Sequence, residues 1–75
     1  MEGLIEGRMV HYVAYNGRHL AAIVIGVGFA DDIDMALFTN MENTNKIKNY
    51  GLQFHQSVPH GDDNKPGTWH FIERT

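Results

Sequence analysis

The chain has 75 residues, which is enough for one small core and too few for a catalytic domain with a separate substrate domain. It contains no cysteine, so disulfides, thiolate metal sites and cysteine nucleophiles are excluded. The formal net charge of -3 and the six scattered Lys and Arg residues argue against a protein that follows phosphate backbones.

The first predicted elements are two strands joined as a hairpin. Met9 to Tyr15 is rich in β-branched and aromatic residues, and it ends at Asn16-Gly17, a dipeptide typical of a type I′ turn. The returning strand, His19 to Val27, is apolar on both of its faces, whereas a strand with one solvated face should alternate. Gly26 and Gly28 predict a bulge or a sharp bend at its end.

The rest of the chain contains three more strand patterns. Alternation predicts a third strand over Asp34 to Thr39, and residues 40–49 (NMENTNKIKN) are typical of a surface loop. Tyr50 to Val58 alternates again, with Leu52, Phe54 and Val58 expected on the buried side. The segment 59–67 (PHGDDNKPG) predicts a turn, and Thr68 to Glu73 predicts the closing strand.

These elements predict a single all-β domain over residues 1–75. The expected fold is a small five-stranded antiparallel sheet curled into an SH3-like barrel, because short strands joined by turns close or nearly close. The expected core residues fall on the apolar side of their strands; they are Val10, Tyr12, Ala22, Val24, Leu37, Leu52, Phe54 and Trp69.

The candidate binding residues are histidines and aromatics. Imidazole serves as a metal ligand or as an acid or base near neutral pH, and His11, His55 and His70 would lie mid-strand, where they could converge on one face. The spacing of the five histidines matches no zinc motif, so the sequence predicts no metal and no cofactor. Tyr50 and Trp69 could stack on a base, sugar or peptide, although a sole tryptophan also serves as a packing anchor.

No catalytic residue is assigned. Ser57 is the only serine, and no strand-to-helix elbow surrounds it, so a serine nucleophile is not expected. The sequence also shows no secretory signal and no apolar run long enough to cross a membrane, which favours a soluble protein with no membrane partner.

Three segments carry a resemblance to a known group of proteins. GRMVHYVAYNGRHLAAIV (7–24), LFTN (37–40) and PGTWHFIER (66–74) together resemble small uncharacterised proteins of tailed bacteriophages and marine metagenomes. That group ends in a PGTWHWPER-like motif, from which Phe71 and Ile72 depart. The resemblance implies a compact β fold, a phage or host protein partner, and a location in the host cytoplasm or the virion.

The leading functional hypothesis is a non-enzymatic phage accessory or interaction module that acts as a homo-oligomer. Ala21, Ile23 and Ile25 project to the opposite side of their strand from the core residues, and a second copy would cover them. Alternatively, the loop formed by residues 40–49 folds over this apolar face and shields it from water.

Two other functions stay open. A nucleic-acid-binding barrel would need basic residues gathered beside Tyr50 or Trp69; the candidates are Arg8, Arg18, Lys46 and Lys48. A histidine-based metal site or enzyme would need His11, His55 and His70 within metal-binding reach of one another.

Overall fold

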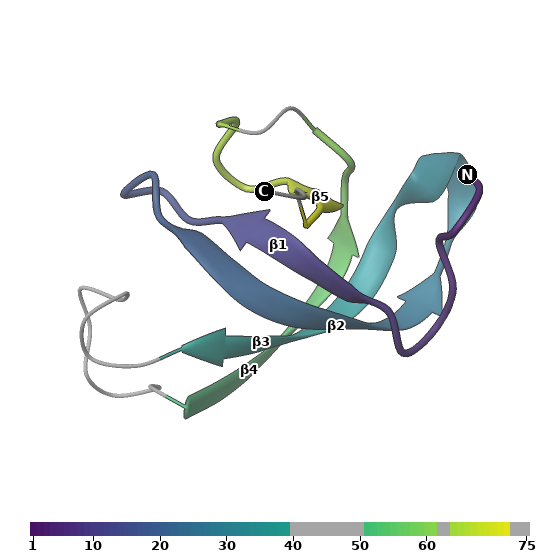
Figure 1. The fold of residues 1–75 in the computed structure, drawn as a ribbon, viewed down its shortest axis with the longest axis horizontal. Coiled ribbons are helices and arrows are strands. Elements are labelled where there is room, and N and C mark those ends of the chain that lie inside the picture. The colour runs from purple at the N-terminus through teal and green to yellow at the C-terminus, as the bar shows by residue number, and fades with distance from the viewer. Residues whose placement is uncertain (40–50, 62–63, 73–75) are drawn as a thin grey trace.

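The computed structural model describes residues 1–39, 51–61 and 64–72. The described strands are β1 (Met9–Val13), β2 (His19–Val27), β3 (Ile33–Thr39), β4 (Gly51–Val58) and β5 (Trp69–Phe71), with a short 3-10 turn η1 (Phe29–Asp31) between β2 and β3. They form one sheet in the order β4-β3-β2-β1-β5, and every adjacent pair is antiparallel (Figure 1). The predicted all-β, five-stranded antiparallel sheet is therefore confirmed. The described residues include no helix long and apolar enough to span a membrane.

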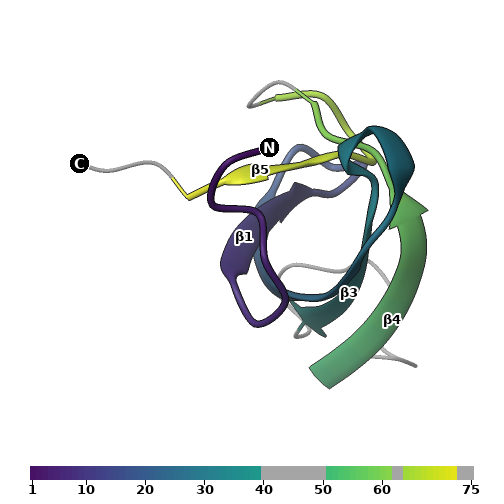
Figure 2. The same cartoon turned by 90° about the vertical axis from the view of Figure 1, so that its right-hand side faces the viewer.

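The sheet curls around its core but stays open. Figure 2 shows the curl, in which the strands surround an interior space that the core side chains fill. β4 and β5 are the two edge strands, and an isolated parallel bridge from His60 to Trp69 joins the segment after β4 to β5. The sheet is not closed into a barrel, so the SH3-like barrel stays a prediction.

The β1–β2 hairpin is present, but its turn differs from the expected type. Val13 pairs with His19, the Ala14 N–H donates to the Arg18 carbonyl (2.9 Å), and the Gly17 N–H donates to the Ala14 carbonyl (2.9 Å). Gly17 has a φ of 85°, whereas Asn16 does not have a positive φ. The turn is thus a three-residue loop with a left-handed glycine, and the predicted two-residue type I′ turn is wrong.

The pairing of β2 with β3 becomes irregular just before Gly26. Its register against β3 shifts between Val24 and Gly26, so Ile25 lies in a bulge. The bulge agrees with the expectation from Gly26, and it bends the strand toward η1. The predicted surface loop at residues 40–49 lies outside the described residues.

Six of the eight expected core residues are buried: Val10, Tyr12, Ala22, Val24, Leu37 and Trp69. Leu4, Leu20, Ile33, Met35 and Val58 complete the cluster. Leu52 and Phe54 were expected there and are 50% and 69% exposed, so their predicted burial is wrong.

A bulge in β4 explains why strict alternation misplaces these two side chains. Met35 pairs with His55 and Ile33 pairs with Val58, so β4 has one residue more than β3 over this stretch. Ser57 takes up the extra residue with a φ of 54°. Val58 therefore points into the core, while Leu52 and Phe54 point to the opposite face of the sheet.

Candidate functional site

The face of the sheet that lies opposite the core is apolar across four strands. Cross-strand pairing places Met9 beside Ile23, Ile23 beside Ala36, and Ala36 beside Phe54. Paired residues project to the same side of a sheet, as do residues two apart in one strand. We call the resulting surface the outer patch; it consists of Met9, Ala21, Ile23, Ala36, Phe38, Leu52 and Phe54.

β4 has the reverse of the polarity expected for a half-buried strand. Its inward side chains include Gln53 and His55, and its outward side chains include Leu52 and Phe54, which are among the most exposed apolar residues of the described chain. In the inward row, the His55 Nε2 and Gln53 Oε1 atoms share a hydrogen bond of 3.2 Å. β4 thus exposes its apolar side chains to water and turns the half-buried Gln53 and His55 toward the core.

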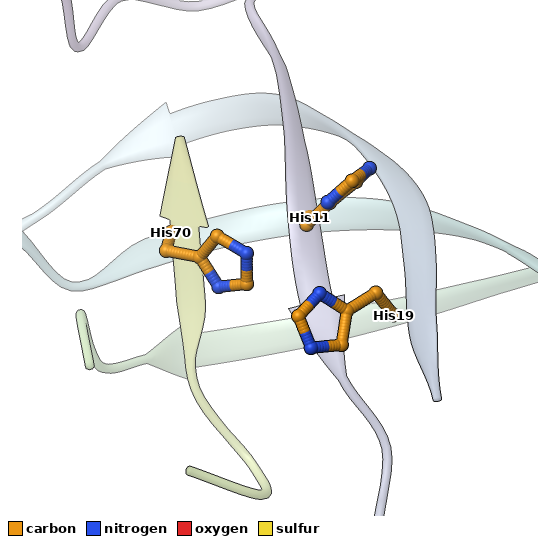
Figure 3. Close-up of side chains that lie close together, drawn as sticks. All are labelled: His11, His19 and His70. Atoms are coloured by element: carbon orange, nitrogen blue, oxygen red, sulfur yellow. The ribbon is translucent and has the colours of Figure 1, made fainter. Parts of the chain in front are cut away.

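Three histidines lie on the same outer face, next to the outer patch. His11 of β1 pairs with His70 of β5 on one side and with Ala21 of β2 on the other. The ring centroids are separated by 5.6 Å for His11 and His70, 5.7 Å for His11 and His19, and 4.9 Å for His19 and His70. Figure 3 shows these side chains, which we call the histidine cluster, gathered together from the three adjacent strands.

Backbone hydrogen bonds fix the strands that carry the cluster. The Val13 N–H donates to the Thr68 carbonyl (2.9 Å), and the Gly67 N–H donates to the Val13 carbonyl (2.8 Å). These bonds hold the segment before β5 against the end of β1, where Val13 is fully buried beside its partner His19. The relative positions of His11, His19 and His70 are thus set by the sheet and not by flexible loops.

The expected convergence of histidines is met only in part. His11 and His70 lie together, but His55 lies on the inward side of β4, where its ring centroid is 5.4 Å from that of Tyr12. Burial raises the pKa of Tyr12, and the neighbouring charge of Tyr15 raises it further. The third member of the cluster is His19.

The two aromatic candidates have different outcomes. Trp69 is 0% exposed, and its indole N–H donates to the Asp31 carbonyl (2.9 Å), so its ring is a packing anchor with no face open to a ligand. Tyr50 lies outside the described residues, as do Lys46 and Lys48.

Of the basic candidates, the Arg8 guanidinium lies over the Phe71 ring, 4.7 Å from its centroid, and Arg18 is exposed in the hairpin loop. In the part of the chain that the structure describes, these residues do not form a basic groove with stacking aromatics.

Sequence reasoning missed His19, although the hairpin contained the signal. With a three-residue loop, Val13 pairs with His19 and His11 pairs with Ala21. His19 is then diagonal to His11 on the same face, at a separation that ring side chains can span. A two-residue turn shifts this register by one residue and directs His19 to the other face.

Comparison with protein-family models, with curated proteins and with solved structures found no match to this chain.

Proposed function

We propose that the protein is a non-enzymatic interaction module that self-associates through the outer patch. The observation that carries the proposal is the reversed polarity of β4, with Leu52 and Phe54 outward and Gln53 and His55 inward. Full burial of a Leu or Phe side chain contributes about 1.5–3 kcal/mol relative to exposure. A second copy that covers these two side chains thus supplies stability that a 75-residue core lacks.

A second copy of the chain fits the outer patch better than a charged ligand does. The patch residues include no charged side chain. An uncharged apolar surface is complementary to itself. Face-to-face packing around a two-fold axis would place Phe54 of one copy against the patch of the other.

The interface residues expected from the sequence belong to this surface or border it. Ala21 and Ile23 are part of the outer patch, and Ile23 lies in the row between Met9 and Ala36. Ile25 lies in the β2 bulge, and its side chain is about half exposed. The proposal therefore keeps all three residues and adds Phe38, Leu52 and Phe54 as the larger apolar contacts.

The biological setting is proposed from the sequence resemblance. It supports a tailed-phage accessory protein, with a phage or host protein as a further partner and the host cytoplasm or the virion as its location. The single bridge from His60 to Trp69 supports retention of the SH3-like barrel as a proposed fold type. This setting can be tested by identification of the genes that flank the coding sequence in its source genome, which should be phage genes.

The test of self-association is sedimentation equilibrium from about 1 to 100 μM. We expect the wild-type mass to rise from that of the 8.5 kDa monomer toward twice that value. Phe54→Asp should remain folded by circular dichroism, because the side chain is 69% exposed, and should remain monomeric throughout.

Phe29→Asp is the matched control, because Phe29 is 96% exposed and lies in η1 instead of the patch. This variant should associate like the wild type. A wild-type chain that stays monomeric at 100 μM would refute the proposal. So would a Phe54→Asp chain that still associates, because its interface must then lie elsewhere.

A further inference from the structure

We propose that His11, His19 and His70 form a binding site for one divalent transition-metal ion, and zinc is the ion that best suits their chemistry. This site is independent of the self-association proposed above, because all three ligands belong to one chain. It also departs from the expectation of no metal, which rested on the spacing of the histidines along the sequence.

The first argument is the distance between ligand atoms. Each histidine offers one ring nitrogen, and these three nitrogens lie within 4.8 Å of one another. Zn–N bonds of about 2.0–2.1 Å at tetrahedral angles put ligand nitrogens roughly 3.4 Å apart. We expect side-chain rotation to bring the three ring nitrogens to that separation without a change in the backbone of the three strands.

The second argument is that the ligands come from three hydrogen-bonded neighbours in the sheet. His11 and His70 are direct cross-strand partners, and His19 lies on β2 next to β1. β5 has only three residues, so an ion bound here would tie this short edge strand to the two strands of the hairpin. Metal binding should therefore stabilise the fold as well as occupy the site.

The third argument is the gradient of exposure across the cluster. His70 is 4% exposed, His11 is half-buried, and His19 is exposed. The two less exposed rings give the site a fixed floor, while His19 lies where an ion would arrive from solvent. A water molecule would complete the coordination on that side, as in zinc sites that have three protein ligands.

The ligand types decide which ions fit. Neutral imidazole suits Zn²⁺, Cu²⁺ and Ni²⁺, whereas Ca²⁺ and Mg²⁺ require several oxygen ligands. The cluster contains imidazoles only, so calcium and magnesium should not compete for it. The edge-to-face contacts among the rings, such as the 68° angle between His19 and His70, are the competing explanation, in which the histidines merely pack together.

The test is isothermal titration of tag-free protein with zinc chloride, together with thermal unfolding. We expect one zinc per chain, and a midpoint that rises by about 10–20 °C when free zinc is 100-fold above its dissociation constant. Cobalt should give the visible absorption of a tetrahedral site, and 1 mM calcium or magnesium should not displace zinc.

His19→Ala is the decisive variant, because its side chain is exposed and its loss should leave the fold intact. It should lower zinc affinity at least about tenfold, since even the loss of residues that only orient metal ligands costs roughly 10–100-fold. His55→Ala is the matched control, because His55 lies on the other side of the sheet, and it should bind zinc like the wild type.

The site would be overturned if the wild type bound no zinc, if His19→Ala bound zinc as well as the wild type does, or if His55→Ala lost affinity as much as His19→Ala does. Fewer than one zinc per chain with a rise in mass would also overturn it, because the ion would then bridge copies. The two proposals fail separately. Phe54→Asp should retain the zinc site while it loses self-association, and His19→Ala should do the reverse.

Discussion

At Gly61, the addition of a single methyl group should destabilise the fold. A Cβ atom at this position would lie 2.3 Å from the Thr68 Oγ1 atom and 2.5 Å from its Cβ. Thr68 is buried and cannot move freely, because its hydroxyl donates to the Lys65 carbonyl (2.7 Å). The Gly61 N–H also donates to the Trp69 carbonyl (3.0 Å), so the backbone cannot withdraw without loss of that bond.

Gly61→Ala should therefore lower the free energy of unfolding by about 1–3 kcal/mol, as overpacked sites do. Urea denaturation measures the change. Gly28→Ala is the control, because a Cβ there would make an ordinary contact of 3.5 Å with the Asp32 carbonyl oxygen, and its φ of -105° suits any residue. An equal effect of the two substitutions would contradict the close approach of residues 61 and 68.

At the scale of the element, the β1–β2 loop depends on the left-handed backbone of Gly17. Its φ is 85°, and a Cβ there would meet no atom within 4 Å, so a substitution causes backbone strain without a clash. Gly17→Val should cost about 1 kcal/mol or more, while Gly17→Asn should cost less, because Asn tolerates this conformation. Thermal unfolding should show a fall of about 4–8 °C for each kcal/mol. Equal midpoints for Val and Asn would contradict the left-handed loop.

The hairpin also shows how much the sequence could predict. Its β2 bounds, His19–Val27, are those expected, and the register follows from the apolar pattern once the core face is chosen. Val10 and Ala22 can share a face as partners only if an odd number of residues separates the strands. The preference of Asn-Gly for a two-residue turn pointed to the wrong loop, and burial of the apolar face determined the actual one.

β4 was harder to predict, for a different physical reason. Leu52 and Phe54 alternate with Gln53 and His55, and alternation defines two faces without saying which one is buried. The apolar face is the usual choice, and here it is the outer one. The bulge at Ser57 then shifts the alternation, so that Val58 points to the opposite side from Leu52 and Phe54. The local sequence gives no sign of this bulge, because a positive φ is uncommon at serine.

The histidine cluster depended on topology that local patterns do not contain. His11 meets His70 only because β5 pairs with β1, which is far from it in the sequence. A simple meander would place β5 beside β4 and would bring His70 toward His55 instead. His19 required the correct loop length, so one long-range strand pairing and one local loop length were both needed before the three rings could be placed together.

At the scale of the whole molecule, Trp69 connects parts of the chain that the open sheet leaves apart. It pairs with Tyr12 of β1, its indole N–H donates to the Asp31 carbonyl of η1 (2.9 Å), and its backbone N–H donates to the Pro59 carbonyl after β4 (3.0 Å). The Trp69 ring is fully buried and lies edge-on to the rings of His60 and Phe71. Both edges of the sheet are therefore attached to the core through this one residue.

Because Trp69 is the only tryptophan, its fluorescence reports on this shared core. A chain with one core, to which both sheet edges are attached through the same residue, should unfold in one cooperative transition. We expect thermal unfolding followed by Trp69 emission to have the same midpoint as unfolding followed by far-ultraviolet circular dichroism at the same protein concentration. If the emission changed several degrees below the loss of β structure, the contacts of Trp69 would open before the sheet does, and the core would not be a single cooperative unit.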